Sequence, residues 1–174
     1  KEYKKTGVYA FYIFDSKIVD FFMKLGIHPG AKIHMGVPNK IMNNRKLAKR
    51  FLRGLFDTDG NIYFDKSRSI KKGINNIPEI KLGTVSEKLV NNIFEILIGL
   101  GFHPRKKKPY KGKRDKNAVH TLLIYRRGDI RKYINEIGFK NPKHYTKWLL
   151  YEKYGFCLPH TSLEERKNLL SKVL

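Results

Sequence analysis

Two carboxylates, Asp57 and Asp59, lie two residues apart directly before Gly60. They follow a stretch beginning at Leu47 in which apolar residues recur at the i, i+4, i+7 spacing of a helix, so we expect both near the helix C-terminus. The helix dipole favours cations at that end, and a bound metal ion would explain why two carboxylates are tolerated there. Metal ions held by carboxylates can drive phosphodiester hydrolysis, because they activate water and stabilise developing negative charge.

The helix that carries these carboxylates has two apolar faces. One face consists of Leu47, Phe51, Gly54 and Thr58, and the other of Ala48, Leu52, Leu55 and Phe56. A helix with so little polar surface needs its own domain on one side and another element on the other. Gly inside a helix costs up to ~1 kcal/mol relative to Ala, so Gly54 indicates close packing. We therefore predict that the first face is an interface with an equivalent helix.

Residues 52–60 resemble the name motif of the LAGLIDADG homing endonucleases, which introns and inteins encode. They match it at seven of nine positions if Phe56 counts as a conservative replacement of Ile, and Arg53 and Thr58 stand where the name has Ala. The resemblance implies a site-specific endonuclease that cuts double-stranded DNA at a long recognition site with Mg²⁺ or another divalent metal. The alternative interpretation is an ordinary amphipathic helix followed by an Asp-Gly turn.

The same resemblance implies roles for individual residues. Asp59 is the expected catalytic metal ligand, the backbone carbonyl of Thr58 assists it, and Asp57 mainly ties the helix end. Lys143, with Lys140 as second choice, is the expected catalytic lysine that stabilises charge or helps to activate water. Mg²⁺ suits such a site because it needs only one or two protein oxygens and keeps several waters.

The chain from Leu47 onward predicts an α+β fold in the order αββαββα, the half-unit of the LAGLIDADG family. Apolar alternation and turn signals predict strands at residues 61–65, 78–85, 102–110 and 119–125. Ser86 is expected to cap a helix that runs to Leu100, and another helix covers residues 129–137. We expect the strands to form a curved antiparallel sheet with one face on the helices and the other on DNA.

A partial repeat is indicated before the acidic helix. Residues 8–14 predict a strand and residues 18–25 a helix capped by Ser16. This unit matches residues 121–139 with a period of roughly 110 residues. Lys32 and Lys143 follow the two matching helices. The alternative is two unrelated strand–helix units.

The repeat predicts the domain organisation. Residues 1–46 are the expected remnant of a first repeat, residues 47–142 a complete repeat, and residues 143–174 a C-terminal helical extension. The remnant lacks an acidic helix of its own, and the chain begins at Lys1, so we expect a truncated two-repeat protein. In the extension, Ser162 and Glu165 form a capping box that opens a final helix to Leu174.

The composition indicates a polyanionic partner. Lys and Arg number 37 against 15 acidic residues, for a formal net charge of +22. Nucleic acid is the simplest partner, with an anionic membrane surface or ribosomal RNA as alternatives. No apolar run is long enough to span a bilayer and no signal peptide is visible, so we expect no membrane partner. Cys157 is the only cysteine, which favours a reducing, cytoplasmic location.

Basic residues interleave with Tyr along the predicted strands and their loops, which suits phosphate contacts and groove reading by a β-ribbon. We predict these DNA-binding residues: Tyr63, Lys66, Arg68, Lys81, Arg105, Lys107, Tyr110, Lys113, Arg114, His120 and Arg126. In the run at residues 105–108 only alternate side chains can face one groove. The alternative is a solvated basic surface that binds nucleic acid without specificity.

Spacing excludes other sites and leaves three functional hypotheses. Gly60 stands at the fourth position of a calcium-loop pattern instead of the sixth, and no histidine pairs with cysteine at zinc spacing. Cutting two strands requires two carboxylates, so a second copy of the chain or a missing first repeat must supply the second one. The main rival is a LAGLIDADG protein that has lost cleavage and binds DNA or intron RNA, as a maturase does. A basic RNA-scaffold protein is the third hypothesis.

Overall fold

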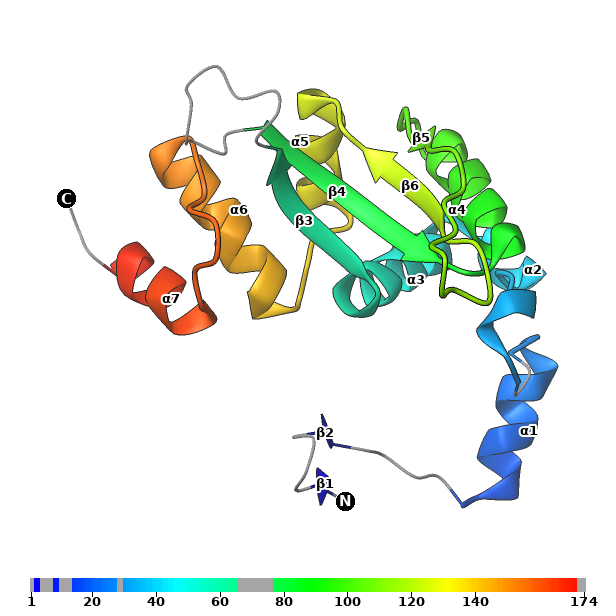
Figure 1. Ribbon diagram of the computed structural model, residues 1–174. Helices are drawn as coiled ribbons and strands as arrows, with labels where there is room; N and C mark the ends of the chain where they lie inside the picture. The colour runs from blue at the N-terminus through cyan, green and yellow to red at the C-terminus, as the bar shows by residue number, and fades with distance from the viewer. Residues whose placement is uncertain (1, 4–7, 10–13, 28–29, 66–76, 172–174) are drawn as a thin grey trace.

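The computed structural model describes residues 2–3, 8–9, 14–27, 30–65 and 77–171 (Figure 1). Two predicted DNA-binding residues, Lys66 and Arg68, lie outside this part of the chain. So do residues 10–13 of the first predicted strand and residues 172–174 of the final predicted helix.

The central unit alternates helices with pairs of strands. Its elements are α3 (Arg45–Thr58), β3 (Gly60–Asp65), β4 (Ile77–Thr84), α4 (Glu87–Gly99), β5 (Arg105–Lys106), β6 (His120–Ile124) and α5 (Arg127–Glu136). The four strands form one antiparallel sheet in the order β3-β4-β6-β5. The predicted α+β class and the αββαββα order are therefore confirmed.

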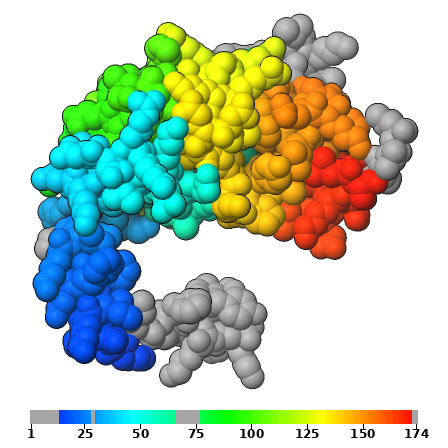
Figure 2. Space-filling model, turned by 180° about the vertical axis from the view of Figure 1, so that it is seen from behind, coloured from blue at the N-terminus to red at the C-terminus, as the bar shows by residue number. Residues whose placement is uncertain are grey.

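The core lies between one face of this sheet and helices α3, α4 and α5. Leu52 and Phe56 of α3 meet Ile62 of β3, and the cross-strand pairs Ile80–Ile124 and Leu82–Leu122 lie on the same side of the sheet. Figure 2 looks onto this helical side. The opposite face of the sheet, which is turned toward the viewer in Figure 1, is not covered by any helix of the described chain. We call it the open face.

Local chemistry fixes both ends of α3. The side chain of Asn44 caps its start by accepting hydrogen bonds from the backbone N–H groups of Lys46 and Leu47, both at 3.0 Å. At the other end the chain enters β3 through Gly60, where an added Cβ would lie 2.6 Å from the carbonyl oxygen of Phe56. Only glycine lets the strand start this close to the helix, so position 59 is held at the end of the sheet.

The predicted strand at residues 102–110 is mostly wrong. Only Arg105 and Lys106 form β5, and Tyr110 makes one isolated bridge to Val119. Pro104 and Pro109 flank this stretch, and proline cannot donate a hydrogen bond to a strand ladder. The basic run is therefore a short edge strand that leads into a loop.

The N-terminal elements lie outside the central unit. They are β1 (Glu2–Tyr3), β2 (Val8–Tyr9), α1 (Ser16–Lys24), η1 (Lys32–His34) and α2 (Asn39–Met42). The cap of α1 is Asp15 and not Ser16 as predicted, because an Asp15 carboxylate oxygen accepts from the N–H of Lys17 at 2.8 Å. Phe14 lies outside the strand that was predicted to include it, and it is exposed.

Helix α1 projects from the body of the molecule in both views (Figure 1, Figure 2). None of its residues is buried, and the apolar residues Ile18, Phe21 and Phe22 are exposed. The counterpart of Ile18 in the predicted repeat is Ile130 of α5, which is completely buried. The two helices thus share a sequence pattern and differ in whether a sheet covers them.

The C-terminal extension consists of α6 (Pro142–Tyr154) and α7 (Leu163–Ser171). Trp148 and Tyr151 of α6 are buried, and the ring of Tyr151 lies 5.5 Å from that of Phe64 in β3. The expected capping box is present, since Glu165 accepts from the N–H of Ser162 and Ser162 Oγ accepts from the N–H of Glu165. Helix α6 runs beside the outer edge of the sheet at β3 (Figure 1).

Candidate nucleic-acid interface and catalytic carboxylate

Asp57 is held within the fold. Its carboxylate accepts hydrogen bonds from the backbone N–H groups of Lys140 and Asn141 at 3.0 and 3.1 Å. The side-chain amide of Asn141 also donates to the Asp57 carbonyl oxygen at 2.9 Å. These bonds join the last turn of α3 to the loop between α5 and α6, which is the tying role expected of Asp57.

Asp59 is the carboxylate that is open to a ligand. It follows α3 and precedes β3, and 42% of its side chain is exposed. Its only described ionic partner is Lys32 of η1, whose Nζ lies 3.3 Å from a carboxylate oxygen. Because Gly60 pairs with Leu82, Asp59 lies at the end of the sheet where β3 begins and β4 finishes.

The lysine beside Asp59 is not one of the two predicted ones. Among the described residues, neither Lys140 nor Lys143 forms a hydrogen bond or ion pair with Asp59 through its side chain. The Lys143 side chain lines a pocket beside α6 instead. Lys32 had a signal in the sequence, because the repeat matches it to Lys143, but its contact with Asp59 spans 27 residues.

The donor set at this end of α3 suits half of a Mg²⁺ site. Asp59 offers one hard carboxylate, and Mg²⁺ needs only one or two besides its waters and a substrate phosphate. The hydroxyl of Thr58 donates its proton to the carbonyl oxygens of Gly54 and Leu55, and the backbone carbonyl oxygen of Thr58 is the atom expected to assist Asp59. Within the described chain no group of three or more His, Cys, Asp or Glu residues could hold a metal ion.

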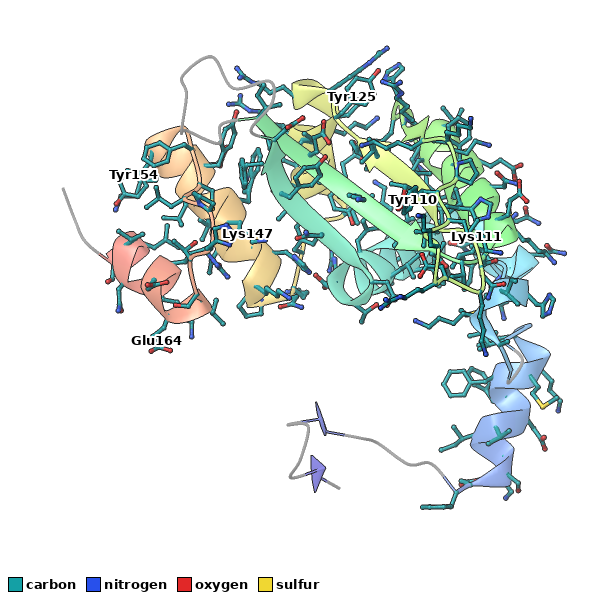
Figure 3. The ribbon with its side chains drawn as sticks, viewed as in Figure 1. Tyr110, Lys111, Tyr125, Lys147, Tyr154 and Glu164 are labelled. Carbon is teal, nitrogen blue, oxygen red and sulfur yellow. The ribbon has the colours of Figure 1, made fainter. Side chains whose placement is uncertain are left out.

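The open face carries several of the predicted DNA-binding residues. The two-residue period of a strand places Tyr63 of β3, Lys81 of β4 and Arg105 of β5 on it. Lys81 and Arg105 are exposed, as are these residues of the adjoining loops and helix start: Lys107, Tyr110, Lys113, Arg114 and Arg126. Figure 3 shows Tyr110 and Lys111 in the segment beside the end of β4. A strip of cations thus borders the uncovered side of the sheet.

His120 is not on this face. It pairs with Thr84 and alternates with Leu122 and Ile124, so it lies on the helix-covered side at the start of β6. Lys106 is also turned away, because its Nζ lies 3.0 Å from the Asn91 side chain of α4. The register of the strands therefore separates His120 from the predicted residues of the open face, and its role in DNA binding stays a prediction.

A buried acid on the open face was missed from the sequence. Glu79 of β4 is 1% exposed and accepts a hydrogen bond from the hydroxyl of Tyr63 on the neighbouring strand. It borders a hollow of about 590 Å³ that Arg105, Lys107 and Tyr125 also line; Figure 3 labels Tyr125. The alternation from Ile77 to Lys81 was the signal that places Glu79 on this side.

The outer face of α3 is only partly covered within the described chain: Phe51 packs against the hydrophobic core and borders a hollow that Gly26 and Pro38 also line. Leu47 and Phe51 are half-buried, while Gly54 and Thr58 are exposed. A Cβ added at Gly54 would meet nothing within 4 Å. Within the described residues, nothing therefore packs against Gly54 as the sequence predicted.

Comparison with known families identifies the fold. The model of the LAGLIDADG-like domain matches residues 46–138, which span the elements from α3 to α5. The chain belongs to this family, whose members are generally endonucleases that bind DNA and work as dimers or as two-domain proteins. No curated protein matches the chain.

None of the helices in the described ranges is both long enough and apolar enough to cross a membrane.

Proposed function

We propose that the chain is one half of a site-specific double-stranded DNA endonuclease that hydrolyses phosphodiesters with a divalent metal such as Mg²⁺. The observation that carries this proposal is the position of Asp59. In a chain of this family, an exposed carboxylate stands where the acidic helix meets the open, cation-bordered face of the sheet.

The residues of this chain would share the work as follows. Asp59, with the carbonyl oxygen of Thr58, holds the metal ion, which supplies an activated water and stabilises the leaving oxygen. Lys32 is within reach of the same site and would balance negative charge as it develops. Lys143, with Lys140 as second choice, stays the proposed catalytic lysine that stabilises charge or helps to activate water. The exposed cations of the open face bind the backbone and orient the duplex.

The second carboxylate comes from an equivalent half. We propose that the face formed by Leu47, Phe51, Gly54 and Thr58 packs against the same helix of a second copy or of a first repeat. In that arrangement residues 1–46 are a remnant of a first repeat, residues 47–142 are the complete repeat and residues 143–174 the extension. A symmetric dimer would read a pseudo-palindromic site, and a two-repeat chain an asymmetric one.

Cleavage of a selected site tests the proposal. Duplexes bound by the wild-type chain would be selected from a random library and cloned into supercoiled plasmid. With Mg²⁺, the wild-type chain and the control Glu152→Gln, which removes an exposed carboxylate of α6, are expected to nick or cut the plasmid. Asp59→Asn is expected to bind with similar affinity and to lose cleavage by at least about 100-fold, as expected for removal of a metal ligand. Equal cleavage by wild type and Asp59→Asn would remove Asp59 from the catalytic site.

A binding protein without cleavage is the second candidate. It is favoured by the single carboxylate of the described site and by the ion pair that Asp59 already makes with Lys32. In that case wild type and Asp59→Asn bind the selected duplex or a structured intron RNA alike, and neither cuts.

A further inference from the structure

The C-terminal extension forms a pocket of about 660 Å³ against the edge of the sheet. Its walls come from β3, from α6, from the segment between α6 and α7, and from α7. The residues that line it are Tyr63, Phe64, Lys143, Lys147, Cys157, Leu158, Pro159, His160, Thr161, Ser162, Leu163 and Arg166. Three of them are permanent cations, and none of these described lining residues is acidic.

Arg166 of α7 is buried in this wall, with 3% of its surface exposed. Its Nε donates to the Thr146 hydroxyl at 2.9 Å, and one terminal nitrogen donates to the Thr161 carbonyl oxygen. The other terminal nitrogen lies 3.4 Å from the carbonyl oxygen of Lys143. All of these acceptors are neutral. The neighbouring Glu165 is engaged in the capping box with Ser162, and no carboxylate of the described chain forms an ion pair with Arg166.

Lys147 brings a second cation to the same place. Its Nζ donates to the side chain of Asn61 at 3.3 Å and to the carbonyl oxygen of Ile62 at 3.2 Å, both on β3. Burial lowers its pKa, and the charge of Arg166 lowers it further. Figure 3 labels Lys147 on the side of α6 toward β3. Removing charges of like sign from water is costly unless an opposite charge compensates them, so a bound anion would stabilise this cluster.

We propose that this pocket binds a phosphate group of the duplex backbone as the duplex lies on the open face of the sheet. The inference rests on the DNA binding in the proposed function and does not depend on cleavage. The pocket shares Tyr63 with the open face, and Lys147 is bonded to Asn61 on the same edge strand. Arg and Lys are the side chains that most often contact backbone phosphates. The extension therefore lengthens the backbone contact beyond the β3 edge, where the family domain itself ends.

The first test measures how salt weakens binding. Lys147→Met removes the ammonium and keeps the apolar stem, and Lys167→Met removes an exposed lysine of α7 outside the pocket. Each phosphate contact contributes about 0.9 to the slope of log K against log salt concentration. Lys147→Met is expected to reduce that slope by about this amount. Between 50 and 200 mM salt the wild-type chain then loses roughly 3.5-fold more affinity than the variant. The slope of Lys167→Met should equal that of wild type, and an unchanged slope in Lys147→Met would overturn the proposal.

A second measurement needs no variant and covers the case in which Lys147→Met fails to fold. The Nε–H resonance of the buried Arg166 is followed by NMR in the wild-type chain. It is expected to shift when a duplex is added at equimolar concentration and to remain unchanged with equimolar inorganic phosphate. A shift with phosphate and none with duplex assigns the pocket to a free phosphate compound and overturns the backbone assignment. No shift with either probe overturns the site itself.

These outcomes are separate from those of the cleavage experiment. A chain that binds DNA with the predicted loss of slope but never cuts would retain the pocket and lose the endonuclease assignment. A chain that cuts, with an unchanged slope in Lys147→Met, would retain the endonuclease and lose the pocket.

Discussion

Asp57 and Asp59 have the same chemistry and nearly the same position, yet the fold gives them different work. The carboxylate of Asp57 accepts from two backbone N–H groups of the α5–α6 loop, whereas that of Asp59 faces solvent and a single lysine. A carboxylate that satisfies backbone donors of another segment supports the fold, and one that keeps free lone pairs can take a metal ion. In the proposed function, the structural and the catalytic carboxylate therefore lie within one turn of chain.

Stability measurements should separate the two residues. Asp57→Ala leaves the N–H groups of Lys140 and Asn141 without their acceptor, so we expect the free energy of unfolding to fall by about 1–3 kcal/mol. Asp59→Ala removes only an exposed ion pair and should cost about 0–1 kcal/mol. Urea unfolding of both variants checks this. Equal decreases in the free energy of unfolding would show that the two carboxylates contribute similarly to stability.

His144 should make stability depend on pH. Its ring is buried, its Nδ1 has no hydrogen-bond partner in the described structure, and burial lowers its pKa, with the charges of Lys147 and Lys143 adding to the effect. In the unfolded chain the His144 side chain takes up a proton near pH 6.5, and in the folded chain it does so only at a lower pH. The contribution of neutral His144 to the free energy of unfolding is therefore fully present above about pH 6.5, and it is lost as the pH falls toward the lowered pKa.

Unfolding curves at pH 7.5 and 5.5 measure this loss. His144→Leu should lose less stability than wild type between the two values, because it has no proton to gain. The control His34→Gln, at an exposed histidine of η1, should behave as wild type. If wild type and His144→Leu lose the same amount, His144 does not carry the effect.

In the proposed function, α3 is the helix through which two halves would assemble. Its inner face is buried against the sheet, while Gly54 and Thr58 of its outer face are exposed with nothing packed on them. Within the described chain a side chain at Gly54 would cause no clash. If a partner helix packed closely against this face, the same side chain would clash with it. Gly54 thus distinguishes packing within the chain from packing between halves.

A substitution at Gly54 should have opposite effects on stability and assembly. Gly54→Leu is expected to keep or raise the free energy of unfolding of the isolated chain, by about 0.5–1 kcal/mol, because glycine disfavours the helix. It should abolish cutting of both strands at the selected site. Gly99→Leu, at another uncrowded glycine at the end of α4, should leave cutting unchanged. Full double-strand cleavage by Gly54→Leu would show that α3 does not face a second half.

What the sequence predicts well at this scale is periodicity, and what it misses is register and distance. The helical spacing from Leu47 and the alternation from Pro78 predict α3 and β4 to within two residues at each end. The prediction of a strand over residues 102–110 did not take account of Pro104 and Pro109, which limit the strand to Arg105 and Lys106. His120 was predicted to bind DNA from its place on a strand, but the face of β6 that carries it depends on pairing with β4, which one strand alone does not reveal.

Long-range partners explain the remaining differences at the site. Lys32 reaches Asp59 across 27 residues, and Arg166 meets Thr146 across 20, so neither contact has a local pattern. From the sequence, a charged residue such as Arg166 in a helix that begins with a capping box is expected to be exposed. Only the packing of α7 on α6 shows that this guanidinium is buried. The bonds by which Asp57 holds the end of α3, by contrast, were expected from the resemblance of residues 52–60 to the family motif.

The whole molecule has one helical side and one open, cation-bordered side, with Asp59 where they meet. In the proposed function, the net charge of +22 favours a polyanionic partner, the open face would present the contacts, and the extension would add a cationic pocket beside β3. The exposed apolar residues of α1 and the surface of α3 at Gly54 are both uncovered in the described chain. Two halves that meet at α3 would bring two Asp59-type carboxylates to the middle of one duplex.

Affinity cleavage from position 59 tests this arrangement most directly. Asp59→Cys would carry an iron–EDTA group, while the buried Cys157, whose pKa is raised by burial, should stay unlabelled. Arg131→Cys, at an exposed residue of α5 behind the sheet, is the matched control. On the bound duplex, the label at position 59 is expected to cut both strands near the centre of the protected footprint, and the control should not cut within it. Cuts only outside the footprint, or the same cuts from both labels, would contradict the placement of Asp59 against the DNA.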